Sequence, residues 1–522
     1  MLLASIALLG AVAVTQAGAS DPGALLDVSI RVDGAADSQF SYGLASSSGF
    51  RVFALSPEDR PGVVAVVGGH GRTAAIRGKA GLTVLFFLHF YQSRQMFLEL
   101  QILNDSIEDP PGKVSAEWTV TMGGAVLSDG KGDFADETGL TLFGGRVLPA
   151  PRVDLLAELL ATMPEPGGIA GVPASGKKLG DPDSIKNTHQ TGSPRNRWIA
   201  IEAARFLATE DAGHIDRMFD FVAAQGRRPY HLSEPSGAPF LFANYPTAHF
   251  IEGKPELKAH RETFGRMSLP PTAFATGGRN GWDHEHMNVE EFYASYVLTG
   301  SRVARRELVL IAEQLLSTRY VKDAGQHQHS ARAFGWVARL LIRAGQATGE
   351  TRYRDGVRRM MGSLKEHWQP SGAYKALVPQ EPRGDHMPTE RWESPFHVAV
   401  ATSALALYDR VYPGDVDATE LLFFCADLLV DQGYSPTNGG FYYDYSVESG
   451  NKNGDGKQTK GVALWIASPL VEAAWAAPAD KKAKYLEPAR RLWDANRIEA
   501  WGKPSSDIYW RWFLPAAKEF GS

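Results

Sequence analysis

Hydrophobic and polar residues alternate with a two-residue period over the first third of the chain. Val28–Val32 alternates, residues 63–67 are mostly β-branched, and residues 82–90 form an apolar run of strand length. Two further runs, 96–103 and 115–121, follow, and clusters of Gly, Asp, Asn and Pro separate the runs. Short strands divided by turn signals are typical of a β-sandwich. We therefore predict an N-terminal β-sandwich domain over residues 20–148.

Beyond about residue 196 the hydrophobic period becomes helical. Ala331, Phe334, Ala338 and Leu341, for example, follow the i, i+3, i+7 spacing of one buried helix face. The pattern predicts helices at residues 198–209, 212–224, 286–299, 301–318, 330–346, 351–368, 395–409, 416–432, 461–476, 481–494 and 506–519.

These predicted helices come in pairs. Turns such as Thr299-Gly300-Ser301 and Thr348-Gly349-Glu350 join the two helices of a pair, whereas longer polar loops separate successive pairs. Repeated helical hairpins with unequal loops favour an (α/α) toroid, in which inner and outer helices alternate and the long loops gather at one end. We predict an α+β multidomain protein with a toroid of five to six hairpins over residues 196–522, after a linker at 149–195. This linker is rich in Pro, Gly and Lys and is predicted to contain one short apolar helix near Val153 to Met163. A stacked open solenoid is the alternative.

Composition narrows the function without specifying it. The 522 residues are 44% hydrophobic and 22% charged, with a formal net charge of −5, as in ordinary globular proteins. No long basic run is present, so we expect neither nucleic acid nor a membrane surface as a partner. The sole cysteine, Cys425, excludes an intramolecular disulfide framework. The pattern does not predict an oligomeric state.

The first residues resemble an export signal. Leu2 to Val14 is an apolar run too short to span a bilayer, and Ala17-Gly18-Ala19 is a small-residue cleavage site. We expect residues 1–19 to be a signal peptide, cleaved before Ser20. The mature protein is then expected to be secreted or periplasmic, without membrane insertion.

Titratable residues gather at the start of the helix predicted at 286–299. Asp283, His284, Glu285 and His286 are consecutive, and Arg279 and Asn280 precede them. A helix that begins near Glu285 places His286 and Glu290 on one face, with Tyr293 one turn further on. A second cluster, with His327, His329 and Arg332, opens the helix predicted at 330–346. A packed core has no need of so many charges, so we predict a catalytic site built from both clusters.

These residue types suit β-elimination on a uronic-acid glycan. A cation or amide must neutralise the substrate carboxylate, a base must remove the adjacent proton, and an acid must protonate the departing glycosidic oxygen. We assign the base to His284 or His286 and the acid to Tyr293, with Arg279, Asn280 and Arg332 as the carboxylate-binding groups. The predicted function is thus a polysaccharide lyase, whose partner is an acidic polysaccharide or oligosaccharide.

Two alternatives remain open. A glycoside hydrolase would use paired carboxylates, with Asp283 or Glu285 facing Glu393 across a cleft. A non-catalytic protein would use the same residues only to bind a glycan. Further aromatic and imidazole groups in the long loops are predicted to bind substrate in any of these cases, and with the second cluster they are Tyr245, His249, His327, His329, Trp392, Glu393, His397 and Tyr442.

The same loops raise the question of a metal. The loop at residues 433–460 is predicted to form a β-hairpin, and residues 451–456 within it mimic the start of a calcium loop, although Val462 stands where a bidentate Glu is needed. His284, His286, His327 and His329 could supply nitrogen ligands to zinc but match no zinc motif. We therefore assign no cofactor from the sequence, and we keep a divalent metal, calcium or zinc, as the one hypothesis.

Several phrases resemble a known family. Gly281-Trp282-Asp283-His284-Glu285-His286, followed by residues 296–300 and 329–336, is similar to the catalytic-toroid loops of exo-acting rhamnogalacturonan lyases and their relatives. The resemblance covers roughly residues 240–410. It implies a β-sandwich paired with an (α/α) toroid, and we expect no large C-terminal β domain in this chain, which departs from that family. The resemblance does not separate a lyase from a hydrolase.

Overall fold

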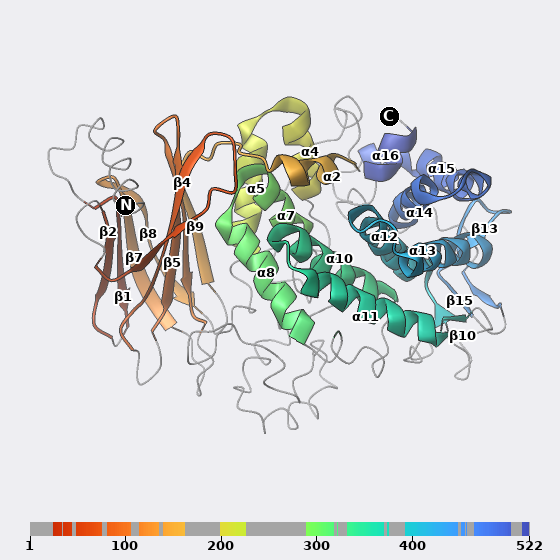
Figure 1. Cartoon of the computed structure of the whole chain (residues 1–522), viewed down its shortest axis with the longest axis horizontal. Coiled ribbons are helices and arrows are strands. Elements are labelled where there is room, and N and C mark those ends of the chain that lie inside the picture. Colours follow the sequence, from red (N-terminus) through yellow and green to blue (C-terminus); the bar gives the residue numbers. More distant parts are fainter. Residues whose placement is uncertain are drawn as a thin grey trace, which may run out of the picture.

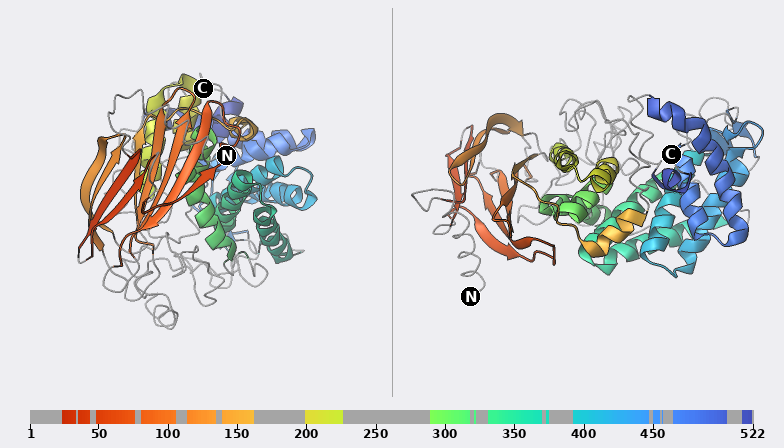
Figure 2. Two further views of the ribbon diagram at one scale, coloured as in Figure 1. Left: turned by 60° about the vertical axis from the view of Figure 1, so that its left-hand side comes forward. Right: turned by 90° about the horizontal axis from the view of Figure 1, so that it is seen from above.

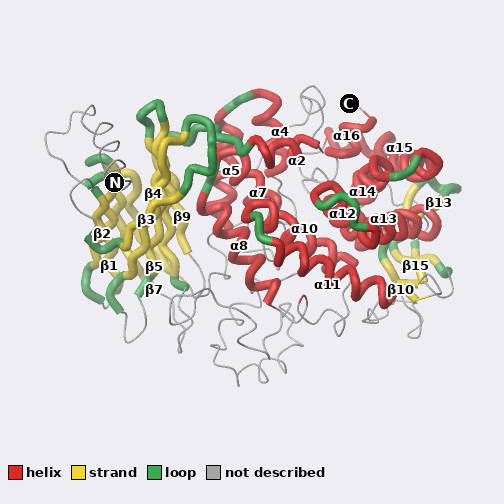
Figure 3. The backbone as a smooth tube through the Cα atoms, viewed as in Figure 1, coloured by secondary structure: helices red, strands yellow, loops and turns green. Residues whose placement is uncertain are grey.

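The structure is a computed structural model that describes most of the sandwich and of the helices. The described residues are 24–33, 35–43, 48–75, 81–105, 114–134, 139–161, 199–225, 289–317, 321, 331–369, 373–374, 392–446, 450–454, 456, 464–502 and 514–520. Strands dominate the first part of the chain and helices the second (Figures 1 and 3). The predicted signal peptide lies outside the described residues, and export stays a prediction.

Two antiparallel sheets form the N-terminal domain, which confirms the predicted β-sandwich. One sheet has the order β2-β1-β7-β8 and the other the order β3-β4-β5-β6-β9. The strand bounds are β1 Leu26–Val32, β2 Ser38–Tyr42, β3 Arg51–Leu55, β4 Val63–Arg72, β5 Thr83–Tyr91, β6 Met96–Leu103, β7 Val114–Met122, β8 Ala125–Phe134 and β9 Gly139–Gly145. Apolar side chains of both sheets fill the space between them.

Strand β5 is buried on both faces, which explains its unbroken apolar sequence. All nine of its residues are buried. Phe86 and Leu88 belong to the core between the sheets, whereas Leu85 and Phe87 belong to a second core that continues into the helices. A strand covered on both sides must be apolar on both. The five-stranded sheet is therefore the middle layer of the molecule, as the rotated views show (Figure 2).

A helix overlaps each of the eleven predicted helical segments, although α7 begins at Glu290, four residues later than predicted. Their bounds are α4 Ile199–Thr209, α5 Ala212–Gln225, α7 Glu290–Thr299, α8 Arg302–Ser317, α10 Ala331–Thr348, α11 Thr351–His367, α12 Pro395–Val411, α13 Val416–Leu428, α14 Leu464–Ala476, α15 Ala479–Gly502 and α16 Leu514–Phe520. A short π-helical turn, η5 (Leu429–Gly433), extends α13. Within the described part of the chain, no helix is long and apolar enough to cross a membrane.

The helices alternate between inner and outer positions, as the toroid prediction requires. The first helix of each hairpin packs on the first helix of the next, in the order α4, α7, α10, α12, α14 and then α16. Helices α5, α8, α11, α13 and α15 each pack on the helix that precedes them. Inner helix α10 is buried around most of its circumference, with fifteen buried residues among its eighteen. A helix that is apolar on all sides belongs inside a layer of other helices.

Connections of two kinds follow from this alternation. Short turns leave the C-terminal ends of the inner helices. One of them contains Gly300, the residue that ends α7. Its φ of 78° is left-handed, a conformation that glycine adopts without strain because it has no Cβ. Long connections lead into the N-terminal ends of the inner helices. The segments 226–288 and 322–330, which precede α7 and α10, contain most of the predicted site and lie outside the described residues.

Part of the predicted linker is a helix of the helical domain. Helix α2 (Val153–Ala161) packs on α7 and is tied to three inner helices. Glu158 contacts Arg343 of α10 and lies 3.9 Å from Arg410 of α12, and Lys518 of α16 donates to the carbonyl of Ala161 at 2.7 Å. The short apolar helix predicted near Val153 to Met163 is thus present, and its apolar side chains join the core of the helical domain.

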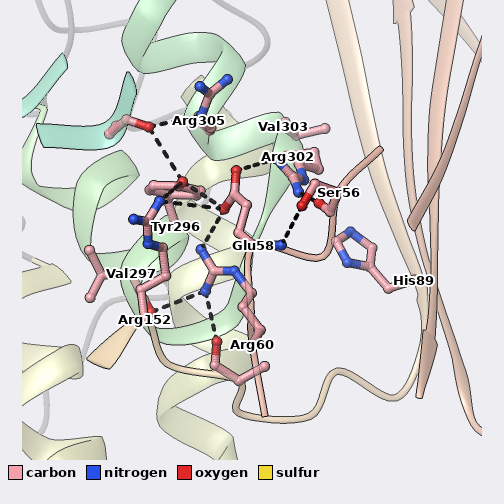
Figure 4. A network of polar contacts seen from close by, with 12 residues as sticks. Ser56, Glu58, Arg60, His89, Arg152, Tyr296, Val297, Arg302, Val303 and Arg305 are labelled. Carbon is pink, nitrogen blue, oxygen red and sulfur yellow. Dashed lines mark hydrogen bonds and ion pairs between the residues drawn. The ribbon is translucent and has the colours of Figure 1, made fainter. Parts of the chain in front are cut away.

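Polar contacts lock the sandwich to the helices around one carboxylate (Figure 4). Glu58, between β3 and β4, accepts a hydrogen bond from the Tyr296 hydroxyl at 2.7 Å and forms ion pairs with Arg302 and Arg60. Burial raises the pKa of Glu58, but Arg302, Tyr296 and Arg60 outweigh burial and lower the pKa overall. Arg60 also donates to the carbonyl of Ala150 at 2.7 Å.

A second carboxylate from the sheet caps a helix. Glu99 of β6 is fully buried, and its Oε2 accepts hydrogen bonds from the backbone N–H groups of Arg302 at 2.7 Å and Val303 at 3.1 Å. These groups belong to the first turn of α8, where the helix has no partners of its own for its N–H groups. The Nε2 atom of His89 lies 3.3 Å from the same oxygen. The sheet therefore fixes the start of α8.

Candidate active site

Ten of the predicted site residues lie outside the described part of the chain, and their roles stay predictions. They are Tyr245, His249, Arg279, Asn280, Asp283, His284, Glu285, His286, His327 and His329. The remaining six, Tyr293, Arg332, Trp392, Glu393, His397 and Tyr442, belong to described segments. For Trp392 and Glu393 the structure describes the backbone.

The N-terminal ends of α10 and α12 bring two of the predicted residues into one neighbourhood. Arg332, in the first turn of α10, has its guanidinium carbon 6.0 Å from the ring centroid of Phe396 in the first turn of α12. His397 follows Phe396, and their rings are 4.1 Å apart. Arg332 is half-buried and His397 is buried. The start of a helix carries partial positive charge, so two such ends side by side favour an anionic ligand.

A small sheet holds the backbone of Glu393 immediately before α12. Strand β12 (Trp392–Glu393) pairs with β15 (Asp444–Ser446), which pairs with β16 (Lys452–Asn453). Ser394, the residue before α12, has extended backbone geometry, and its Oγ donates to the carbonyl of Tyr443 at 2.8 Å. Glu393 thus belongs to a strand that directly precedes the N-terminal end of an inner helix.

The register of this sheet defines a row of three positions. Glu393 is paired with Tyr445, and Tyr445 is paired with Lys452. Paired positions on neighbouring antiparallel strands lie side by side on one face of the sheet. We name Glu393, Tyr445 and Lys452 the cross-strand row.

Aromatic rings surround the lysine of the cross-strand row. The Nζ of Lys452 is 5.0 Å from the ring centroid of Tyr445 and 5.5 Å from that of Tyr442. It donates to the backbone carbonyl of Gln432 at 2.6 Å. Burial lowers the pKa of Lys452.

The predicted hairpin at 433–460 is present as two hairpins, β15–β16 and β13 (Tyr434–Ser435) with β14 (Gly440–Phe441).

Tyr293 does not lie where a proton donor to a substrate is expected. Its side chain is completely buried in α7, and burial raises the pKa of its hydroxyl. The guanidinium of Arg343 stacks over its ring at 4.3 Å from the ring centroid. The sequence prediction fails here because the helical period placed Tyr293 on one face with Glu290, and that face points into the core.

Sequence reasoning also missed a cluster of ion pairs that lies between the inner helices. Glu290, the first residue of α7, forms ion pairs with Arg339 at 2.7 Å and with Arg343 at 2.8 Å. Burial raises the pKa of Glu290, but the two arginines outweigh burial and lower the pKa to about 2. The available signal was the pair of arginines at i and i+4 in an otherwise apolar helix.

The same cluster continues toward α14. Arg339 donates to the Oγ of Ser403 at 2.8 Å, and Ser403 in turn donates to Glu472 at 2.7 Å. Glu472 pairs with Arg410 at 3.1 Å. All its acids and bases are matched, so this cluster holds the inner helices in register rather than offering a free catalytic group.

Metal binding gains no support from the described residues. No group of three or more His, Cys, Asp and Glu side chains there could hold a metal ion. The segment that mimics a calcium loop begins as strand β16, and its Lys452 brings a positive charge to the place. Asp455 and the four predicted histidine ligands lie outside the described residues, so the calcium and zinc hypotheses stay untested.

Comparison with known proteins finds distant structural likeness. No family model matches the chain, and no curated protein matches it. Among solved structures, the unsaturated glucuronyl hydrolase of Streptococcus agalactiae matches with 11% identity over 72% of this chain and 94% of its own, at a TM-score of 0.40. Cellobiose 2-epimerase of Bacillus thermoamylovorans matches with 12% identity over 66% and 87%, at 0.37.

An α-mannanase of Bacteroides thetaiotaomicron matches with 15% identity over 32% of this chain, at a TM-score of 0.26. The chain spans 43% of the length of that mannanase. At these scores the likenesses establish no function for this chain. The resemblance of the sequence phrases to polysaccharide lyases stays a prediction.

Proposed function

We propose that the chain is a glycoside-cleaving enzyme that acts on an acidic glycan by hydrolysis. The observation that carries the proposal is the position of Glu393, on a strand at the mouth of α12, in one row with an aromatic residue and a lysine. Two carboxylates suffice for hydrolysis: one protonates the leaving oxygen, and the other activates water or attacks the sugar. Asp283 or Glu285 would be the second carboxylate.

Hydrolysis is preferred over β-elimination because of Tyr293. Elimination requires a proton donor at the glycosidic oxygen, and the sequence named Tyr293 for that role. A phenol that is completely buried, with Arg343 stacked over its ring, cannot reach a sugar. The carboxylate pair does not depend on Tyr293. His284 and His286 remain candidates for binding or proton transfer in either reaction.

The test is a screen of uronate-containing oligosaccharides with two readouts. Hydrolysis releases reducing ends without ultraviolet absorbance, whereas elimination creates a C4–C5 double bond that absorbs. We expect reducing ends alone from the wild type. Glu393→Gln should lower turnover by about 100-fold or more, the scale of a general acid–base contribution. Glu420→Gln, an exposed substitution on α13, is the matched control and should leave turnover unchanged.

Each other outcome contradicts part of the proposal. New ultraviolet absorbance would establish a lyase, and loss of that activity in Tyr293→Phe would return Tyr293 to its predicted role. Full activity of Glu393→Gln would remove Glu393 from the site. Binding of the oligosaccharides without turnover, over a range of pH and with added calcium or zinc, would favour the non-catalytic glycan-binding alternative.

A further inference from the structure

Lys452 is a half-buried cation without a carboxylate partner among the described residues. Lys365, Lys481 and Lys484 of the helical domain each pair with at least one Asp or Glu. Lys452 instead contacts Gln432, through its backbone carbonyl at 2.6 Å and its side-chain oxygen at 3.3 Å. An ammonium group has three N–H donors, so at least one is left for another acceptor.

Partial burial disfavours the charged form of Lys452, although its Nζ contacts with Gln432 remain exposed to water. Withdrawing a charged group from water without a counter-charge destabilises its charged form, and proteins normally pair such groups. The rings of Tyr442 and Tyr445 compensate in part, because an aromatic face attracts a cation. They leave the net positive charge in place. An anionic ligand would complete the pairing.

The cross-strand row puts this cation at a useful distance from Glu393. Neighbouring strands are about 4.8 Å apart, so the Cα atoms of Glu393 and Lys452 are separated by roughly 10 Å across β15. A sugar bound beside Glu393 can therefore extend a charged substituent toward Lys452. Tyr442 lies next to the cation and supplies an apolar face of the kind on which sugar rings stack.

We propose that Lys452 determines specificity by binding an anionic group of the glycan, a carboxylate of a uronate residue, with Tyr442 as the adjacent stacking surface. This inference rests on the proposed function and assigns the acidic substrate class to a particular side chain. Lys452 is a recognition residue in this scheme and takes no part in bond cleavage.

The test compares Lys452→Gln and Lys452→Arg with the wild type on two substrates. One is an active uronate oligosaccharide from the screen, and the other is the same oligosaccharide with its carboxylates converted to methyl esters. We expect Lys452→Gln to raise KM for the acidic substrate by about 10-fold or more, the scale of one charge-assisted hydrogen bond. KM for the ester and kcat for both substrates should change little, and Lys452→Arg should retain most of the affinity.

Lys484→Gln is the matched control, because Lys484 pairs with Asp427 and Asp431 on the outer helices. It should leave KM unchanged for both substrates. Equal losses on acid and ester in Lys452→Gln would show a structural role for Lys452 and overturn the inference, while the proposed hydrolase would stand. If the wild type cleaves no glycan, the proposed function fails first. Calorimetric titration with the same acidic oligosaccharide then tests Lys452 separately, and equal affinity of wild type and Lys452→Gln would overturn the inference too.

Discussion

Two charged side chains of the described residues, Glu290 and Lys452, are in opposite situations: the first has charged partners in the core, and the second has none of opposite charge. Glu290 belongs to the first kind: it is buried and held by Arg339 and Arg343. Lys452 belongs to the second, with no acidic partner among the described residues. A matched buried pair stabilises the fold only while both partners are present, since removing one leaves the other uncompensated. The two kinds of charge therefore predict opposite consequences of mutation.

Glu290→Gln should destabilise the protein by about 3 kcal/mol at pH 7, because two arginines would lose their counter-charge. The pKa of Glu290 is about 2 in the folded protein against 4.5 ordinarily, so the unfolded chain binds its proton more readily. The stabilisation from Glu290 is therefore complete above about pH 4.5 and is lost as the pH falls toward 2.

Urea unfolding of the wild type and of Glu290→Gln between pH 7 and pH 3 measures this effect. The difference in the free energy of unfolding should narrow steadily below pH 4.5. Glu117→Gln is the control, since Glu117 lies on the exposed face of β7 beside Lys131. A difference that stays constant through this pH range would show that Glu290 is not the ionised centre of the cluster.

At the scale of elements, the sequence predicts what depends on local pattern. The period-two runs become strands and the helical runs become helices, because burial of one face is already encoded in the spacing of apolar residues. The short helix within the predicted linker followed from its apolar residues, but the sequence did not show what it packs on. Helix α2 packs on α7 and contacts α10 and α12 through Glu158, and these helices come more than a hundred residues later.

The sequence predicted where some of the candidate residues lie in the fold, but it did not predict the surroundings of every one. Arg332, Glu393 and His397 were identified because they precede or open helices, and the structure places all three at the N-terminal ends of inner helices. Tyr293 was assigned incorrectly because a helical period cannot tell an inward face from a cleft. Lys452 was missed because its partners, Tyr445 and Gln432, are brought to it by strand register, which local spacing does not specify.

The cap on α8 gives a prediction at this scale. Glu99→Ala removes the acceptor of two helix N–H groups and leaves them buried, so we expect a loss of about 2 kcal/mol in the free energy of unfolding. Glu99→Gln keeps one side-chain oxygen and should lose less. Chemical denaturation measures both, with hydrogen exchange at the first turn of α8 as the local readout. Equal stability of Glu99→Ala and wild type would show that water replaces the carboxylate.

At the scale of the whole molecule, the sandwich and the helices share one core. The cluster that includes Leu85 and Phe87 of β5 continues without interruption to Tyr485 and Trp493 of α15. The Glu58 and Glu99 contacts add polar links across the same boundary. The two parts therefore differ in secondary structure, but each contributes to the stability of the other.

We accordingly expect a single cooperative unfolding transition. Calorimetry should give one peak, and the loss of strand and helix signals by circular dichroism should coincide in temperature. Arg302→Ala, which removes the ion pair to Glu58, should lower the temperature of both signals together. Two resolved transitions, with strand signal persisting after the helices melt, would show that the sandwich is stable alone.

The position of α2 has a consequence for the order of assembly during synthesis. Residues of α2 leave the ribosome early, yet one of their contacts, from Lys518 to the carbonyl of Ala161, joins positions 357 residues apart. Arg343 of α10 and Arg410 of α12 can contact Glu158 only after both helices have been synthesised. During most of translation, the nascent chain therefore contains an amphipathic helix whose packing partners have not yet been synthesised. A chaperone that shields apolar helices has a defined target here, namely residues 153–161.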